Sequence, residues 1–316
     1  MEECHADEHP VCRRLADRSR DGAHGLRRRC VTRPVHRPDR RGHARPDRGP
    51  QPDAGCLHPA NVTTLTAGKL TIGADNPAFP PYFEETKPKP AGSVWELGDP
   101  TNGKGLESAT AYAVAKALGF TQDQVVWKPV PFNNAIQPGP KDFDLYLTQV
   151  SYSADRAKAV DLSDGYFDLN QAVVGLKADG IAKVTTVAGL AAFKLGAPVG
   201  TTSYQYIVDN IKPTQAPSVF STLDAAIAAI KAGQIDGVVV DLPTAFYMTA
   251  AQIDNSTIVG SLPTAGGTVE HFSIVLNLAS PLTTCVNAAI AAIKGDGTLQ
   301  SIVSQWITSQ GAPELK

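Results

Sequence analysis

The sequence predicts an α/β fold divided into two lobes, each a mainly parallel sheet flanked by helices. From Lys69 onwards, apolar runs of strand length alternate with runs of helical periodicity, which is typical of sheets covered on both faces. The 256 residues after position 60 suit two lobes of ordinary size. No apolar run reaches the roughly twenty residues of a membrane span, so we expect no part of the chain to cross a membrane.

The first elements alternate between strand and helix. Residues 70–75 predict a short buried strand, and prolines between residues 77 and 81 prevent its continuation. Residues 84–104 are rich in Pro, Gly and Lys and predict a surface loop. Helical spacing over residues 106–118 predicts a helix, which Gly119 can end in the left-handed conformation. Further strands are expected at residues 124–130 and 143–147.

The second half repeats this alternation. Residues 170–176 predict a strand long enough to cross between the lobes. Further strands are expected at residues 197–200, 235–240 and 272–276. Helices are expected at residues 203–210, 223–232, 282–293 and 298–308.

Residues 1–60 differ sharply in composition from the rest. They hold 13 of the 14 arginines, six of the seven histidines and four of the five cysteines, with no lysine and no apolar run long enough to bury. We expect this segment not to fold. The abrupt change leads to the hypothesis that much of residues 1–55 is out-of-frame translation replacing an export signal, which resequencing the 5′ end of the gene tests.

No metal site is expected in this segment. Its thiols and imidazoles lack the paired short spacing of structural zinc sites. The residues considered are Cys4, Cys12, His24, Cys30, His36 and Cys56.

A single arginine, Arg156, occurs among the 16 basic residues that follow position 60. Its planar fork of donors matches a carboxylate or a phosphate in a way that an ammonium cannot. Arg156 is therefore the first candidate for ligand binding. The same region has 22 acidic residues and a charge of about −6, which argues against nucleic acid as a partner.

Polar residues gather where predicted strands end. Residues 148–156 follow one strand and include Arg156, residues 201–203 follow another, and Asp241 follows a third. In open α/β sheets, ligands bind beyond the carboxyl ends of strands. One cation, one hydroxyl-rich helix start and one carboxylate form the set that an α-amino acid zwitterion needs.

Seven motifs occur in one order along the chain. They are L-T-I-G-A-D, F-P-P-Y-F, G-L-E, Q-V-S-Y-S-A-D-R-A-K-A-V-D-L-S-D-G-Y-F, G-T-T-S, I-D-G-V-V-V-D and D-G-T-L. This order resembles the family 3 solute-binding proteins of amino-acid ABC importers, from about Leu70 to Trp306. The N-P-A before F-P-P and the loop through D-P-T-N-G-K-G look like the actinobacterial branch.

The resemblance implies a fold and a mode of action. The fold would be the two-lobed, type II periplasmic-binding-protein-like α/β fold with a two-strand hinge. Lobe 1 would comprise residues 61–169 plus 271–316, and lobe 2 residues 170–270, joined near residues 168–172 and 266–272. An amino acid would be captured between the closing lobes and delivered to a permease, without a cofactor and without catalysis.

The resemblance also implies which residues hold the carboxylate of the ligand. Arg156 would pair with it, and Thr202 would add its hydroxyl and backbone N–H at a helix start. Thr201 and Ser153 are also expected to bind the ligand, although Ser153 stands where the family commonly has threonine.

At the other end of the ligand, Asp241 would take the ammonium, helped by oxygens of Gln149 and Ser151. Phe79 and Phe132 occupy positions where the family places aromatic rings against the ligand side chain. Gln149 departs from the usual serine or glycine, and we expect it to narrow the pocket and affect side-chain preference.

Each assignment has a structural alternative. Arg156 could form a surface ion pair with its neighbour Asp155, worth under about 1 kcal/mol. Asp241 could only cap the helix that follows it, and residues 201–203 could likewise be only a helix cap. The two phenylalanines could belong to the core. Glu107 is expected to support the start of its helix rather than to contact the ligand.

Cys56 and Cys285 are the only thiols after residue 55, and a disulfide between them would fit an oxidising compartment. Residues 53–56 end like a lipoprotein cleavage site but lack the apolar stretch that precedes one, so no export signal is recognisable. From the resemblance we expect an exported, lipid-anchored monomer at the cell surface or in the periplasm, working with ABC permease and ATPase subunits.

Two other functions stay open. Periplasmic cyclohexadienyl (arogenate) dehydratases have a similar fold, and that activity would need an acid or base beside the carboxylate-binding arginine. His271 is expected near the hinge rather than there. A ligand-sensing receptor component is the other alternative.

Overall fold

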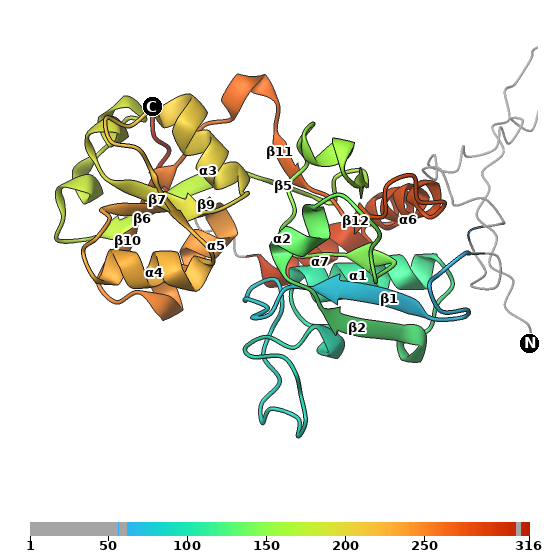
Figure 1. The fold of residues 1–316 in the computed structure, drawn as a ribbon. Coiled ribbons are helices and arrows are strands. Elements are labelled where there is room, and N and C mark those ends of the chain that lie inside the picture. Colours follow the sequence, from blue (N-terminus) through green and yellow to red (C-terminus); the bar gives the residue numbers. More distant parts are fainter. Residues whose placement is uncertain (1–55, 57–61, 308–310) are drawn as a thin grey trace, which may run out of the picture. The chain divides into compact units, whose positions relative to one another are not determined.

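The computed structural model describes Cys56, residues 62–307 and residues 311–316, which form two five-stranded sheets and one two-stranded sheet (Figure 1). The predictions made for residues 1–55 lie outside the described residues. Within the described ranges, no helix is long and apolar enough to cross a membrane.

The first large sheet has the strand order β2-β1-β3-β12-β4. Its strands are β1 (Leu70–Ala74), β2 (Val125–Pro129), β3 (Leu145–Tyr146), β4 (Asp161–Leu162) and β12 (Val275–Leu276). Its helices are α1 (Leu106–Ala117), α2 (Phe132–Ile136), α6 (Thr283–Gly295) and α7 (Thr298–Trp306). The predicted strands and helices of this part are present, with ends that differ by a few residues.

The second large sheet has the order β10-β6-β9-β7-β8. Its strands are β6 (Gln171–Leu176), β7 (Leu195–Pro198), β8 (Ser218–Phe220), β9 (Gly237–Asp241) and β10 (Ser256–Ser261). Its helices are α3 (Thr202–Tyr206), α4 (Leu223–Lys231) and α5 (Leu242–Tyr247). The helix expected over residues 203–210 is α3 followed by a π-helical turn.

Short helical turns complete the described chain. They are η2 (Pro100–Asn102), η3 (Gln122–Gln124), η4 (Arg156–Lys158), η5 (Gly180–Lys183), η6 (Ala188–Ala192), η7 (Ile207–Ile211), η8 (Met248–Gln252) and η9 (Ala265–Gly267).

Two short strands connect the large sheets. β5 (Phe167–Leu169) leads from β4 to β6, and β11 (Glu270–Phe272) leads from β10 back to β12. They pair antiparallel, with His271 opposite Asp168. The strand expected over residues 272–276 is therefore two strands, because Phe272 pairs within the hinge whereas Val275 pairs with β3 and β4.

The sheets are mixed rather than mainly parallel. Among the described strands, β1 runs parallel to β2 and β3, and β7 runs parallel to β8 and β9. The pairs of β12 with β3 and β4, and of β6 with β9 and β10, are antiparallel. A parallel neighbour requires a crossover, usually a helix, whereas β6 and β12 each enter their sheet directly from the hinge.

The end of the chain also differs from the expected lobe boundary. Residues 311–316 lie against the second sheet, where Glu314 bridges to Ser261 and Leu315 is buried at 2% exposure. Ser261 donates its N–H to the carbonyl of Pro313 at 2.7 Å, and Leu315 donates to Ser261 at 3.0 Å. The last residues thus return to the half of the molecule that was predicted to end at residue 270.

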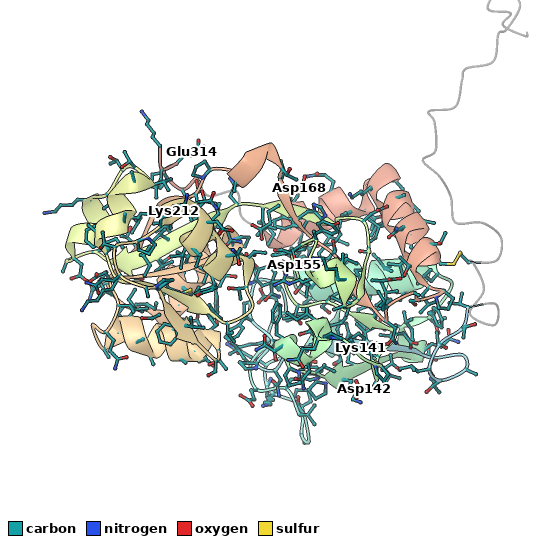
Figure 2. All side chains as sticks on the ribbon, turned by 45° about the horizontal axis from the view of Figure 1, so that its top comes forward. Lys141, Asp142, Asp155, Asp168, Lys212 and Glu314 are labelled. Carbon is teal, nitrogen blue, oxygen red and sulfur yellow. A yellow bond between two sulfur atoms is a disulfide. The ribbon has the colours of Figure 1, made fainter. Side chains whose placement is uncertain are left out.

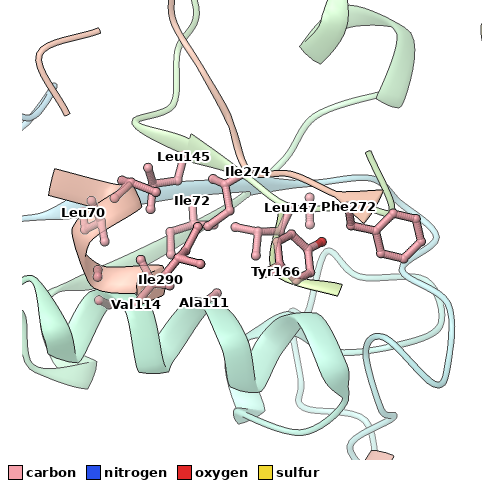
Figure 3. Close-up of a cluster of buried hydrophobic side chains, with 14 of the residues drawn as sticks. Leu70, Ile72, Ala111, Val114, Leu145, Leu147, Tyr166, Phe272, Ile274 and Ile290 are labelled. Carbon is pink, nitrogen blue, oxygen red and sulfur yellow. The ribbon is translucent and has the colours of Figure 1, made fainter. Parts of the chain in front are cut away.

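Buried side chains alternate along the strands because both faces of each sheet are covered. Val238 and Val240 pack with α4 and α5, whereas Val239 between them packs with α3. In the first sheet, Leu70 and Ile72 pack against Val114 of α1 and Ile290 of α6 (Figure 3). Such an arrangement fixes the strand ends from which the functional loops emerge.

Gly105 determines how α1 begins. Its φ is 99°, and a Cβ there would lie 2.4 Å from the carbonyl oxygen of Tyr82. This close approach lets Glu107 donate its N–H to the same carbonyl at 3.0 Å. The first turn of α1, with the Glu107 side chain, is thereby held against the loop that follows β1.

Cys56 and Cys285 form a disulfide, visible as a yellow bond in Figure 2, with their Cα atoms 5.4 Å apart. Cys285 lies in α6, and the two cysteines are 229 residues apart in the sequence. The bond ties the start of the described chain to a helix that packs on the first sheet.

We expect peptide mapping by mass spectrometry without reduction to recover Cys56 and Cys285 in one linked peptide pair. The Cys285→Ser variant should lose about 2–5 kcal/mol of unfolding free energy, because the unfolded chain is then no longer cross-linked. Alkylation of both thiols in the unreduced protein would contradict the disulfide.

We expect Asp144→Ala to lower the unfolding free energy by about 1–3 kcal/mol in urea denaturation. The buried carboxylate accepts the N–H of Leu65 at 2.8 Å and of Thr71 at 2.7 Å, and the substitution leaves both donors unpaired. Asp142→Ala is the matched control. It removes only an exposed ion pair with Lys128 and should cost less than about 1 kcal/mol. Equal losses in the two variants would contradict this role of Asp144.

Candidate functional site

A cavity of about 320 Å³ lies where loops of the two large sheets meet. Its walls come from the residues that follow β1, β2 and β3 in the first sheet and from those that follow or end β7, β8 and β9 in the second. The lining residues are Asp75, Asn76, Pro77, Phe79, Pro131, Phe132, Asn133, Thr148, Gln149, Arg156, Pro198, Val199, Thr201, Thr202, Ser203, Ser221, Thr222, Leu223, Asp224, Val240, Asp241 and Thr244. The carboxyl ends of six strands therefore converge on one cavity. We call this cavity the cleft.

Seven of the nine predicted ligand-binding residues line the cleft. They are Phe79, Phe132, Gln149, Arg156, Thr201, Thr202 and Asp241. Ser151 and Ser153 instead hold Arg156 in place. The carbonyl of Ser151 accepts from Arg156 Nη1 at 2.5 Å, and the hydroxyl of Ser153 accepts from the Arg156 backbone N–H at 3.2 Å.

Arg156 is buried, with 8% of its surface exposed, at the start of η4. Its second terminal nitrogen, Nη2, donates to the carbonyl of Gly200 at 2.8 Å, and its guanidinium carbon lies 5.4 Å from the centre of the Phe132 ring. The alternative of a surface ion pair with Asp155 is wrong. Asp155, labelled in Figure 2, is exposed and pairs with Lys158 at 2.7 Å.

Gly200 lets the second sheet approach this guanidinium. Its φ is 74°, and a Cβ there would lie 3.0 Å from the side-chain oxygen of Asn133. The contact of Arg156 with Gly200 joins the loop after β3 to the loop after β7, so it spans the two halves of the cleft. Tyr82 and Thr244 also meet across the halves, with their hydroxyl oxygens 3.1 Å apart.

Asp241 ends β9 and directly precedes α5, but its side chain makes no cap hydrogen bond to that helix. Its Oδ1 accepts from Gln171 Nε2 at 2.7 Å. Burial raises the pKa of Asp241 to about 8. The charge of Glu270 adds to this effect, while the Gln171 hydrogen bond and the charge of Arg156 oppose it. The capping alternative therefore does not describe this carboxyl.

Residues 201–203 divide between structural and cleft-lining roles. The Thr201 hydroxyl accepts from the Tyr204 N–H at 3.1 Å and donates to the carbonyl of Pro198 at 2.8 Å, so Thr201 caps α3 as the structural alternative expected. Ser203 donates to Gln171 Oε1 at 2.7 Å. Thr202, the first residue of α3, faces the cleft.

Glu107 has a role that sequence reasoning missed. It is fully buried, and its carboxylate accepts the backbone N–H of Gln149 at 2.6 Å, the Gln149 side-chain amide and the Tyr166 hydroxyl at 2.5 Å. Burial raises the pKa of Glu107 to about 7, against the effect of these hydrogen bonds. Gln149 has a φ of 44°. Glu107 therefore positions Gln149 at the cleft, in addition to supporting the start of its own helix.

Asp75 and Asp224 are cleft residues that were also missed. Asp75 follows β1, the same kind of position that drew attention to Asp241, so the rule of strand ends could have found it. Its backbone N–H donates to the Thr148 hydroxyl at 2.9 Å, and burial raises its pKa. Asp224 lies in the first turn of α4. Three carboxyl groups thus line the cleft with the single guanidinium of Arg156.

Within the described part of the chain, no group of three or more His, Cys, Asp or Glu side chains is placed to hold a metal ion. The chemistry that the cleft offers is recognition of charge and hydrogen-bonding groups. It presents one fixed cation, several carboxyl groups and two aromatic rings.

Comparison with known proteins places the chain in a family. Residues 70–309 match the model of the bacterial extracellular solute-binding proteins, family 3. The chain is 30% identical over 173 residues to the ABC transporter arginine-binding protein 1 of Escherichia coli K12, covering 52% of this chain and 67% of that protein.

Solved structures give the same picture. An ancestral arginine-binding protein bound to glutamine superposes with a TM-score of 0.60 at 27% identity, covering 77% of this chain and 99% of that one. An ancestral amino acid-binding protein, described as a precursor of cyclohexadienyl dehydratase, has a TM-score of 0.60 at 24% identity, covering 76% and 96%, and shows the fold alone. The matched region contains the cleft and the strands that build it, and the chain belongs to the bacterial extracellular solute-binding proteins of family 3.

Proposed function

We propose that this protein captures an α-amino acid in the cleft and delivers it to an ABC permease. One observation carries the proposal: a buried guanidinium from the first half and a carboxyl group from the second face the same small cavity. An α-amino acid has a carboxylate and an ammonium on one carbon, so it complements these two groups at once. The volume of about 320 Å³ is at the small end of ligand sites.

Arg156 binds the ligand carboxylate in this proposal. A guanidinium has five N–H donors, and the hydrogen bonds to Ser151 and Gly200 use two of them. Those two bonds and the Phe132 ring fix the orientation of the fork before ligand arrives. Preorganisation of this kind reduces the entropy lost on binding. Thr202 adds a hydroxyl on the opposite wall.

Asp241 and Gln149 bind the ligand ammonium. The amide nitrogen of Gln149 donates to Glu107, which leaves its carbonyl oxygen as the acceptor available to the cleft. An ammonium has three donors, and a carboxylate with one further oxygen satisfies most of them. The ligand would therefore contact both halves of the molecule and favour the closed arrangement by the contacts that exist only there.

The ligand side chain is proposed to be cationic. Once Arg156 and Asp241 have neutralised the zwitterion, Asp75 and Asp224 leave the cleft with an excess of negative charge. Phe79 offers a ring face on which a guanidinium or ammonium can lie. The similarity to the arginine-binding protein of Escherichia coli supports the same ligand class.

We propose that the protein acts outside the cytoplasmic membrane. In this proposal it is a monomer, and its partners are the permease and ATPase subunits of an ABC importer. Its membership of an extracellular family supports this location. The lipid anchor stays a prediction. A Cys56 sulfur bonded to Cys285 has no valence left for a lipid thioether, so these two roles exclude each other in one molecule.

One observation favours a second candidate, a dehydratase of the cyclohexadienyl type. Asp241, with its pKa raised to about 8, is a carboxyl group that keeps a proton near neutral pH and so has the character of a general acid beside Arg156. We expect no product from arogenate in an absorbance assay, because binding rather than turnover is proposed here. Sustained product formation would favour the dehydratase.

We expect L-arginine and L-lysine to give the largest shifts in a thermal-shift screen of the common amino acids. A ligand at a hundred times its Kd adds about 2.7 kcal/mol of stability, or roughly 5–10 °C. Asp75→Asn should weaken L-arginine binding by roughly tenfold and leave L-glutamine binding nearly unchanged. Asp254→Asn, an exposed site with the same loss of charge, is the control. A screen in which no amino acid shifts the transition would refute the proposed function.

We expect Arg156→Ala to cost about 2–5 kcal/mol of binding free energy by titration calorimetry, since the ligand carboxylate would be buried without its partner. Arg156→Lys keeps the charge but not the planar fork of donors, so its affinity for the ligand should lie between those of the wild type and Arg156→Ala. Circular dichroism and the melting temperature serve as folding controls. Unchanged affinity in the alanine variant would remove Arg156 from the site.

A further inference from the structure

Two carboxyl groups share a single amide nitrogen behind the cleft. Gln171 Nε2 donates to Asp241 Oδ1 at 2.7 Å and to Glu270 Oε2 at 3.0 Å. The two carboxyl oxygens are therefore about 6 Å apart at most. Ser203 donates to Gln171 Oε1 at 2.7 Å, which fixes the amide with its nitrogen towards the carboxyl groups.

Glu270 reaches this point from the hinge. It lies in β11, opposite Leu169 of β5, where the chain returns from the second sheet to the first. Its other oxygen, Oε1, is buried and has no hydrogen-bond partner within the described structure. A buried carboxylate oxygen without a donor is costly, and a nearby cation lowers that cost.

The charged and titratable groups around the pair do not neutralise it. Arg156 is the cation that faces it, while Glu107 adds negative charge on the side of Asp241, where the hydroxyl groups of Tyr82 and Tyr166 also lie. Glu270 also borders a second cavity, lined among others by Tyr152, Tyr206, Asp209 and His271. The Arg156 guanidinium donates to the carbonyls of Ser151 and Gly200, and within the described structure it forms no ion pair with either carboxyl group.

We propose that Asp241 and Glu270 act as one carboxyl pair, in which Asp241 holds a proton in the ligand-free protein and releases it when the ligand ammonium takes its place. The charge of Glu270 this close to Asp241, in a site partly out of water, disfavours the ionised form of Asp241. The neutral Gln171 amide orients both groups but supplies no charge. Glu270 is thus a positioning residue, which acts on the ligand through Asp241.

The exchange balances in charge and protons. The proton on Asp241 passes to solvent, and the ammonium then contacts the ionised Asp241 carboxylate in the cleft. Burial and Glu270 together hold the pKa of Asp241 at about 8, so the proton is present at neutral pH. Binding should therefore tighten as the pH rises, by roughly tenfold per unit between pH 6 and pH 7.5. This inference rests on the proposed function, because an ammonium must reach Asp241.

Titration calorimetry in buffers of different ionisation enthalpy measures the proton release directly. With the wild-type protein at pH 7, we expect about one proton released on binding of L-arginine and the same number with L-glutamine, because both carry the α-ammonium. Binding of either amino acid without proton release would overturn the carboxyl pair while leaving the proposed function intact.

Glu270→Gln tests whether Glu270 acts on Asp241 through the carboxyl pair or has only a structural role. This variant should release fewer protons than the wild type and show a correspondingly shallower pH profile, because burial alone still raises the pKa of Asp241, with affinity at pH 6 at least equal to that of the wild type. Glu84→Gln is the matched control. Burial also raises the Glu84 pKa, but Glu84 lines a different groove, with Pro80 and Trp306. Full proton release in Glu270→Gln would overturn the proposal.

The pH dependence of unfolding, measured without ligand, tests the carboxyl pair even if no amino acid binds. A carboxyl whose pKa is raised on folding binds more protons in the folded state, so stability falls as the pH rises from about 4 through about 8. The unfolding midpoint of Glu270→Gln should fall less than that of the wild type over this range. Parallel profiles would overturn the pair, whereas failure of all amino acids to bind refutes the proposed function alone.

Discussion

The buried guanidinium of Arg156 needs hydrogen-bond acceptors, and two loops of the cleft provide them. The carbonyl of Ser151 comes from its own loop, and the carbonyl of Gly200 comes from the other half of the molecule. Gly200 has a φ of 74°, which glycine adopts readily, and a Cβ there would lie only 3.0 Å from the side-chain oxygen of Asn133. The Phe132 ring covers one face of the cation. A cation held in this way, with donors to spare, is prepared for an anion in the cavity.

Glutamine side chains, rather than cations, hydrogen-bond to Asp241 in the cleft and to two carboxyl groups outside its lining, those of Glu107 and Glu270. The side-chain amide of Gln149 donates to Glu107, and that of Gln171 donates to both Asp241 and Glu270. A neutral amide fixes the direction of a carboxyl group without neutralising it, so the charge remains available to a ligand. The raised pKa values of Glu107 and Asp241 follow from the same arrangement, because burial is not offset by a nearby ion pair. The site thus combines one fixed cation with carboxyl groups that still need a partner.

The parts of the site that the sequence predicted are those at the ends of strands. Arg156, Thr202 and Asp241 each follow a strand, and local pattern is enough to find such positions. Glu107, Gln171 and Glu270 were not found, because their roles come from contacts 42, 70 and 99 residues away along the chain. A glutamine at the start of an apolar strand carries no local signal of the two carboxyl groups to which it will donate.

Composition and periodicity alone determined that the chain alternates strands and helices, that residues 1–60 differ in composition from the rest, and that a single arginine follows residue 60. They act through local preferences, which depend on neighbours in sequence. Tertiary structure decided the antiparallel entry of β6 and β12 into their sheets, the return of residues 311–316 to the second sheet, and the meeting of Asp241 with Glu270 on one amide. These features depend on which distant segments pair and in what register, and only the folded chain brings those segments together.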